Sequence, residues 1–279
     1  MGPEYQSLIR LVGTSEEQER FSGMTYQDMF DIVRKRVEDA EATGLNTLIM
    51  DHPHHFIPCT TINHDAKFPR ESRAQPTIFL EGISSSPKNP TFLPDAFLFS
   101  FTPIFTIRHP ARVLQSYIRA TYHAKHILER GKVLLSQVEV IARFKWERLV
   151  FDAFNQFEGN TRPIVVDGDK LVQDPQSQMR SLCERLGIDT DKIDYVWDPG
   201  DLGVVQDAYS DCPEMFKEGF HGTLVRSSGV VSDKNIGPVD IFHEKQRWAE
   251  EWDEELASQM EDLESDLKRI TSKARATHR

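Results

Sequence analysis

The segment from Pro103 to Tyr117 constrains the fold more than any other part of the chain. An apolar run over 104–107 ends at Arg108, and Pro110 stands where helices favour proline. The segment therefore predicts a buried strand, a sharp turn and a helix, with Ser116 in the second helical turn. Because a helix N-terminus presents free N–H groups and partial positive charge, Arg108 and Ser116 predict an anion site suited to a phosphate ester. The alternative is that Arg108 pairs with a carboxylate.

Short strands alternate with helices along the rest of the chain. Each strand is nearly continuous in apolar residues, which predicts one α/β domain over 1–279, with a parallel sheet flanked by helices. Ligands of such sheets bind at the carboxyl ends of the strands, where Asp51, His52 and Arg108 are expected. The expected elements are a helix at 25–42 with a Thr25–Asp28 capping box, strands at 45–50, 104–108 and 163–169, and helices from 110, at 136–157, from 175 to Gly187, and at 241–270.

The expected C-terminal helix carries an apolar stripe at helical spacing. This stripe predicts packing against the body of the domain, and a homodimer through the same face is the alternative. Its members are Trp248, Trp252, Leu256, Met260, Leu263 and Leu267.

The composition excludes several classes of binding partner. The formal net charge of −11 argues against nucleic acid or an anionic membrane as the main partner, so an anionic ligand needs a local positive pocket. No apolar run approaches the length of a membrane span, and we expect no signal peptide at the start of the chain. Three cysteines, at 59, 183 and 212, are too few for a disulfide framework or a cysteine zinc site. We expect a cytoplasmic protein that acts on a small molecule.

Two motifs carry a family resemblance. The run Ile107-Arg108-His109-Pro110, with Ser116 eight residues after the arginine, resembles the 3′-phosphate motif of the PAPS-dependent sulfotransferases. The run from Ile164 to Pro175, followed by Leu182 to Gly187, is similar to the segment after that family's third core strand. The resemblance implies a sulfotransferase, P-loop NTPase-like fold and a transferase. It also implies that Arg108 and Ser116 hold the 3′-phosphate of the nucleotide PAPS.

Two further segments resemble the family's site. The run Leu48 to Pro53 looks like the strand that ends in Lys-Thr-His, which implies that His52 is the general base for an acceptor hydroxyl. The alternative is that His52 only caps the strand end through a hydrogen bond. The run Thr223 to Gly229 resembles the late loop over the nucleotide, which implies that Arg226 and Gly229 contact the nucleotide. A glycine-rich surface turn is the alternative there.

The sequence also departs from the family pattern. No Gly-x-x-x-x-Gly-Lys-Ser/Thr run precedes residue 45, and Met50 replaces the lysine that stands two residues before the family's histidine. The resemblance is to fungal chains of specialised metabolism, without the N-terminal phosphosulfate loop. Two expectations follow: this loop belongs to a longer form of the protein, or the fold serves chemistry that does not use PAPS.

The histidines invite a metal interpretation. The run Asp51-His52-Pro53-His54-His55 offers potential ligands, but adjacent histidines do not face one metal on regular structure, and the proline constrains the turn. No Cys-based or His-Glu-x-x-His pattern is present. We therefore predict no metal site. Cys183 stands on the apolar face of its helix and is predicted to be a core residue rather than a nucleophile.

The leading expectation is sulfuryl transfer to the hydroxyl of a small, partly apolar metabolite. The cofactor expected for this reaction is PAPS. If the donor site is lost, we expect no cofactor. The second is a PAPS-independent tailoring enzyme of secondary metabolism, in which His52 moves protons during isomerisation, dehydration or cyclisation. The third is an inactive binding or scaffold protein that keeps only the fold.

Overall fold

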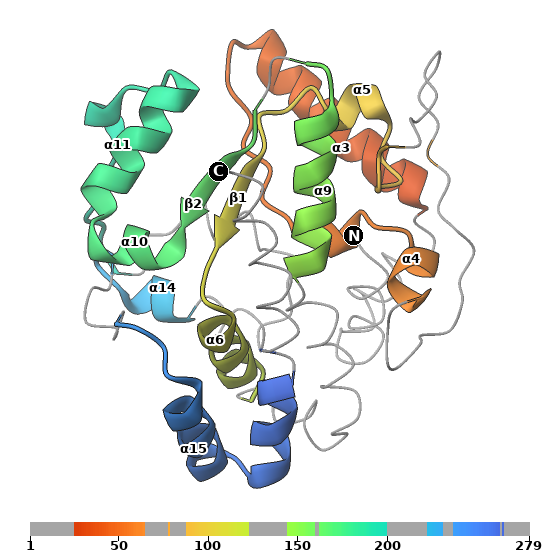
Figure 1. The fold of residues 1–279 in the computed structure, drawn as a ribbon. Helices are drawn as coiled ribbons and strands as arrows, with labels where there is room; N and C mark the ends of the chain where they lie inside the picture. The colour runs from red at the N-terminus through yellow and green to blue at the C-terminus, as the bar shows by residue number, and fades with distance from the viewer. Residues whose placement is uncertain are drawn as a thin grey trace, which may run out of the picture. The chain divides into compact units, whose positions relative to one another are not determined.

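The structure is a computed structural model that describes residues 25–64, 78, 88–122, 144–159, 162–199, 222–230, 237–262 and 264. The chain forms two compact units, each built from two stretches of sequence. The first unit comprises Met1–Thr102 and Trp146–Arg162, and the second comprises Pro103–Lys145 and Pro163–Arg279. No helix among the described residues is long and apolar enough to cross a membrane. Figure 1 shows the elements with their labels.

Helix α3 (Tyr26–Ala42) of the first unit follows the predicted bounds. The Thr25 side chain accepts a hydrogen bond from the Asp28 backbone N–H, and the Asp28 carboxylate accepts one from the Thr25 N–H at 2.7 Å. This capping box satisfies two N–H groups that an α-helix leaves without partners at its start. Gly44, with φ +74°, follows the last turn in the left-handed conformation that glycine adopts without a steric cost.

Aromatic side chains build the core of the first unit. Phe30 of α3 meets Phe97 edge to face at 4.9 Å between ring centroids. Phe99 contacts Phe154 edge to face at 5.1 Å and stacks on Phe157 at 4.1 Å. Such pairs add to the free energy gained from burial alone. The remaining elements are a 3₁₀ turn η1 (Pro53–His55), α4 (Cys59–His64), α5 (Asp95–Leu98) and α9 (Phe144–Gln156), which is the described part of the helix expected at 136–157.

The strand predicted over 45–50 is wrong. Residues 45–50 have no regular secondary structure, and Leu48 and Met50 are 83% and 77% exposed. A strand needs a neighbour to pair its N–H and C=O groups, and an apolar run supplies neither the neighbour nor a burying face. His52 therefore follows an extended, exposed segment rather than the end of a buried strand.

The second unit holds a parallel sheet. Strand β1 (Ile104–Ile107) pairs with β2 (Ile164–Asp167), and the register sets Ile107 opposite Asp167. Helices α6 (Pro110–Tyr122), α10 (Gly168–Gln173) and α11 (Pro175–Leu186) follow these strands (Figure 1). The predicted α/β class, a parallel sheet flanked by helices, is therefore confirmed.

Two caps fix the ends of the helices after β2. The strand expected to reach Asp169 ends at Asp167, because the Asp167 carboxylate accepts hydrogen bonds from the backbone N–H groups of Asp169 and Lys170 and starts α10. Asp174 caps α11 in the same way, and Gly187, with φ +67°, ends it as predicted. Cys183 is buried, as the sequence predicts. Beyond α11 lie a 3₁₀ turn η2 (Thr190–Lys192) and a short helix α14 (Gly222–Arg226).

The helix expected at 241–270 is broken. Helix α15 (Ile241–Glu251) ends at Trp252, and a second helix covers 254–262. Asp253 starts that helix, because its carboxylate accepts a hydrogen bond from the Leu256 N–H at 2.7 Å. In a continuous helix this N–H would instead donate to the backbone carbonyl four residues earlier.

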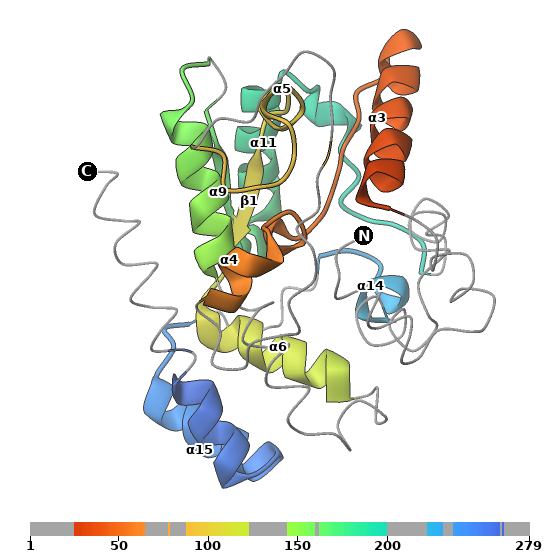
Figure 2. The same ribbon diagram turned by 90° about the vertical axis from the view of Figure 1, so that its right-hand side faces the viewer.

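Helices α6 and α15 lie side by side in Figures 1 and 2. Trp248 of α15 is fully buried against Leu114 and Ile118 of α6, together with Met260. The predicted packing of the Trp248 and Met260 stripe is confirmed, whereas Leu263 and Leu267 lie outside the described residues. The homodimer stays a prediction.

Candidate functional site

A carboxylate lies between two arginines at the carboxyl ends of the strands. Arg108 Nε donates to Asp169 Oδ1 at 3.0 Å, and Arg112 Nη1 lies 2.7 Å from Asp169 Oδ2. The three side chains are 26%, 14% and 19% exposed in the order Arg108, Arg112, Asp169. Partial burial opposes ionisation of Asp169, but the bonds and charges of Arg112 and Arg108 hold the pKa of that carboxyl below its usual value.

The strand register creates this cluster. Because Ile107 and Asp167 are opposite each other, the residues that follow the two strands meet at the same edge of the sheet. Gly168 permits the close approach, since a Cβ on it would lie 3.3 Å from the Ile107 carbonyl oxygen. Asp169 then stands in the first turn of α10, beside Arg108.

The structure shows where the two residues of the predicted anion site, Arg108 and Ser116, lie. Arg108 follows β1 as predicted, and it pairs with a carboxylate, which was the stated alternative. Ser116 lies exposed in α6. The His109 imidazole accepts a hydrogen bond from the Ala111 N–H at 3.3 Å and so occupies part of the α6 N-terminus. Phosphate binding by Arg108 and Ser116 stays a prediction. Sequence reasoning missed Arg112 and Asp169, although Arg112 stands one turn after Arg108.

Arg226 and Gly229 lie near a small structural bridge. Gly229 pairs with Val196 in an isolated antiparallel bridge, and a Cβ on Gly229 would lie 3.0 Å from the Tyr195 carbonyl oxygen. The Arg226 guanidinium folds back over Gly222, the first residue of its own helix α14. These contacts give Gly229 a structural reason to be glycine. Nucleotide contact by Arg226 and Gly229 stays a prediction.

Three imidazoles gather around η1 in the first unit. The rings of His52 and His54 stack with 5.3 Å between centroids, and His55 meets both rings edge to face, at 5.7 Å from His52 and 4.3 Å from His54. His52 is exposed and precedes η1, whereas His54 is buried. No group of three His, Cys, Asp or Glu side chains in the described part of the chain is arranged to hold a metal ion.

Asp51 holds one of these rings in place. The Asp51 carboxylate lies 2.5 Å from Nδ1 of His55. Burial tends to raise the pKa of Asp51, but the hydrogen bond and charge of His55 lower it below the usual value. The carboxylate fixes the orientation of the imidazole, and a carboxylate–imidazole pair suits general acid–base work. The sequence shows both residues, but their pairing depends on the turn at Pro53.

The predicted site residues fall in both units. His52 belongs to the first unit, and Arg108, Ser116, Arg226 and Gly229 belong to the second. The roles of His52 as the base and of the other four residues as nucleotide contacts stay predictions.

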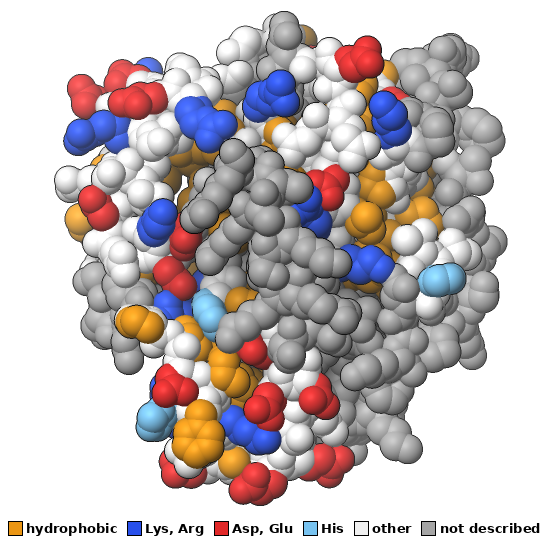
Figure 3. Space-filling model, in the orientation of Figure 1, with side chains coloured by type: hydrophobic (Ala, Val, Ile, Leu, Met, Phe, Trp, Pro, Cys, Tyr) orange, Lys and Arg blue, Asp and Glu red, His pale blue; other side chains and the backbone are white. Residues whose placement is uncertain are grey.

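The surface around α15 is acidic. Residues 240–262 carry nine Asp or Glu against two Lys or Arg, and Figure 3 shows red side chains outnumbering blue over this part of the chain. An anionic ligand gains nothing from such a surface.

Comparisons with known proteins agree with the fold. Residues 92–192, which include β1, β2 and the Arg108–Asp169–Arg112 cluster, match the model of a family described as "Sulfotransferase family". The curated protein "Sulfotransferase ppzF" of Metarhizium majus (strain ARSEF 297) is 24% identical over 254 residues, covering 86% of this chain and 71% of the relative. Its namesake in Metarhizium rileyi (strain RCEF 4871) is 22% identical with the same coverage. No solved structure gives a significant match.

Proposed function

We propose that this chain is a sulfotransferase, which transfers a sulfuryl group from PAPS to the hydroxyl of a small, partly apolar metabolite. The observation that carries the proposal is the pair of guanidiniums at the carboxyl ends of β1 and β2, where parallel sheets bind their ligands. Two guanidiniums that already share one carboxylate form a donor set that suits a phosphate dianion equally well.

In this proposal one group of residues binds the nucleotide and another residue transfers the proton. Arg108 and Ser116 would hold the 3′-phosphate, with Arg226 and the backbone at Gly229 as further contacts. His52 would accept the proton of the acceptor hydroxyl as that oxygen bonds to sulfur. The donor supplies an activated sulfuryl group, and cleavage of its bond to the phosphate releases adenosine 3′,5′-bisphosphate. An imidazole suits this step because its pKa lies near neutral pH.

Calorimetry with adenosine 3′,5′-bisphosphate tests the donor site. We expect wild type to bind the nucleotide and Arg108→Ala to lose binding. Arg119→Ala is the matched control, because Arg119 also lies on the second unit but pairs with Glu251. Its affinity should stay within about twofold of wild type, since surface charges contribute little. No heat at millimolar nucleotide would overturn the proposal.

Turnover with PAPS and a panel of phenols and alcohols tests the base. His52→Ala should lower the rate by about 10²–10⁴-fold, the usual contribution of a general base. His243→Ala serves as the control, because His243 is an exposed histidine paired with Asp240. Equal rates in the two variants would remove His52 from the mechanism.

The imidazole cluster favours a second candidate function. Asp51 and His55 form an acid–base pair that needs no nucleotide donor. A PAPS-independent tailoring enzyme, which isomerises, dehydrates or cyclises its substrate, would use such a pair. Turnover that continues without PAPS and is lost in His55→Gln would favour this candidate, and the absence of any turnover in both assays would favour a scaffold.

A further inference from the structure

We propose that Arg112 is a second phosphate-binding residue, and that Asp169 occupies the position of the phosphate until the nucleotide binds. The inference rests on the proposed function, since it concerns the same site. It concerns a residue outside the Arg108 and Ser116 motif, and it makes Asp169 an internal competitor of the nucleotide.

The Asp169 carboxylate contacts the two arginines in the way that a bound anion would. Each of its two oxygens faces a different guanidinium, Oδ1 at 3.0 Å from Arg108 Nε and Oδ2 at 2.7 Å from Arg112 Nη1. A phosphate monoester presents three oxygens and nearly two charges, so it can satisfy both guanidiniums and more of their donors. Because phosphate and carboxylate would repel each other at this distance, the nucleotide must displace Asp169.

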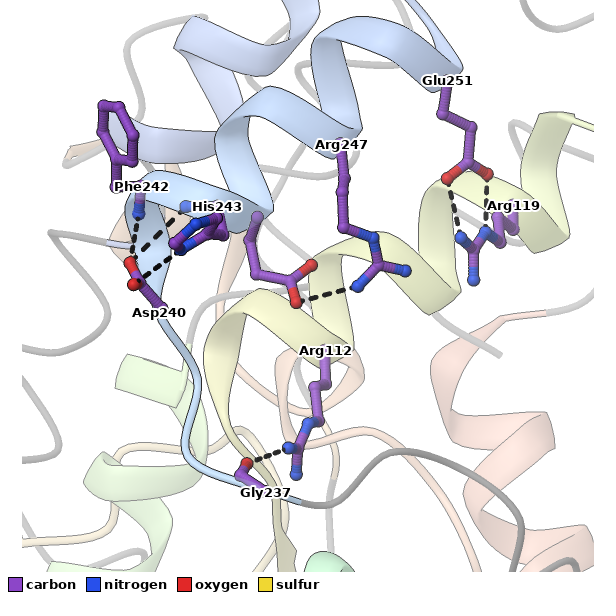
Figure 4. A network of polar contacts seen from close by, with 9 residues as sticks. Arg112, Arg119, Gly237, Asp240, Phe242, His243, Arg247 and Glu251 are labelled. Atoms are coloured by element: carbon purple, nitrogen blue, oxygen red, sulfur yellow. Dashed lines mark hydrogen bonds and ion pairs between the residues drawn. The ribbon is translucent and has the colours of Figure 1, made fainter.

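Arg112 stays in place when Asp169 leaves. Its Nη2 donates to the Gly237 carbonyl oxygen at 2.5 Å, on the segment that leads into α15 (Figure 4). Its side chain is only 14% exposed, so little rotamer freedom remains to be lost when an anion binds. Arg108 is the more exposed of the two, and its guanidinium has donors beyond Nε for a ligand.

Asp169 is also free to leave without unwinding its helix. The backbone N–H groups at the start of α10 are capped by Asp167, not by Asp169. The Asp169 side chain therefore contributes to the charge of the cluster rather than to the cap. Two arginines and one carboxylate carry a net positive charge, and removing the carboxylate leaves both cations for the ligand.

Titration of adenosine 3′,5′-bisphosphate into matched variants tests the inference. We expect Asp169→Asn to bind the nucleotide about tenfold or more tightly than wild type, and Arg112→Lys to bind it about tenfold more weakly, because lysine lacks the planar fork. Glu251→Gln is the control for the charge change, since Glu251 also pairs with an arginine of α6. It should stay within about twofold of wild type.

Each outcome decides for or against the inference. Circular dichroism checks that the variants are folded, and Arg112→Lys keeps the charge and gives an answer if Asp169→Asn does not fold. Nucleotide binding by wild type that is lost in Arg108→Ala but unchanged in Asp169→Asn and Arg112→Lys overturns the inference and leaves the proposed function standing. Absence of binding by wild type overturns both the proposed function and this inference.

Discussion

Asp51 and His55 are held together across the 3₁₀ turn at Pro53, with Oδ1 of the first 2.5 Å from Nδ1 of the second. His55 lowers the pKa of Asp51, against the effect of burial, so the pair favours the ionised carboxylate. We expect His55→Gln to raise the pKa of Asp51, because burial then acts without the opposing charge. A carbon-13 NMR titration of the carboxyl groups measures this shift.

The same pair has a consequence for acid stability. A carboxyl whose pKa is lower in the folded state stabilises the fold above its unfolded pKa, and this stability is lost as the pH falls through the folded value. In His55→Gln the pKa of Asp51 moves back toward its unfolded value, so this variant should be less stable than wild type above that value, and it should lose less stability than wild type as the pH falls. His64→Gln, in the adjacent helix α4, is the control, and equal acid profiles for both variants would contradict the pairing.

Glu147 of α9 should make the fold less stable at neutral pH. Its Oε2 is buried with no hydrogen-bond partner among the described residues, and burial raises the pKa of this carboxyl from 4.5 to about 7. Below pH 4.5 both folded and unfolded states keep the proton. As the pH rises to 7 only the unfolded state ionises, so stability falls. Glu147→Gln should be more stable than wild type at pH 8, by about 1–3 kcal/mol, and not at pH 4.

Urea denaturation at the two pH values measures this difference. Glu158→Gln is the control, since residue 158 is exposed just beyond the same helix. A gain at pH 4 that equals the gain at pH 8 would show that ionisation is not the cause.

The contact between α6 and α15 contains a buried apolar side chain and a surface ion pair, so their contributions to the free energy of unfolding can be compared. Leu114 is completely buried in this contact, so Leu114→Ala should lower the free energy of unfolding by about 2–5 kcal/mol. Arg119 donates to Glu251 through two bonds of 2.6 and 2.7 Å, but its side chain is half exposed. Arg119→Ala should cost only about 0.5–1 kcal/mol, less at high salt. Thermal unfolding at two salt concentrations measures the stability of both variants. Equal losses of stability in Leu114→Ala and Arg119→Ala would contradict the burial of Leu114 between the two helices.

Asp253 should determine where the second C-terminal helix begins. Its carboxylate caps the Leu256 N–H, so Asp253→Ala should lower stability by about 1 kcal/mol, whereas Asp253→Asn keeps an acceptor and most of the stability. Hydrogen exchange of the 254–262 amides reports the effect locally. If the alanine and asparagine variants exchange alike, the cap does not hold this helix.

Several elements could be predicted from the sequence because their causes are local. The bounds of α3 follow from Thr25 and Asp28, which lie three residues apart, and the end of α11 follows from Gly187. The start of α6 follows from Pro110, a residue with fixed φ. In each case the interacting groups are close in sequence, so the chain carries the information without its tertiary partners.

The errors have non-local causes. The strand expected at 45–50 does not form, because pairing needs a neighbouring strand that an apolar run cannot specify. The continuous helix expected at 241–270 breaks at Trp252, where the cap on Asp253 competes with the helical ladder.

The sequence by itself determined that Arg108 lies between an apolar run and the start of a helix. It also indicated two possible partners for that guanidinium, a phosphate and a carboxylate. Only the tertiary structure decided that Asp169, 61 residues away, is the carboxylate and that Arg112 shares it. The reason is physical: an ion pair forms where parallel strands end side by side, and strand register is a property of two segments rather than one.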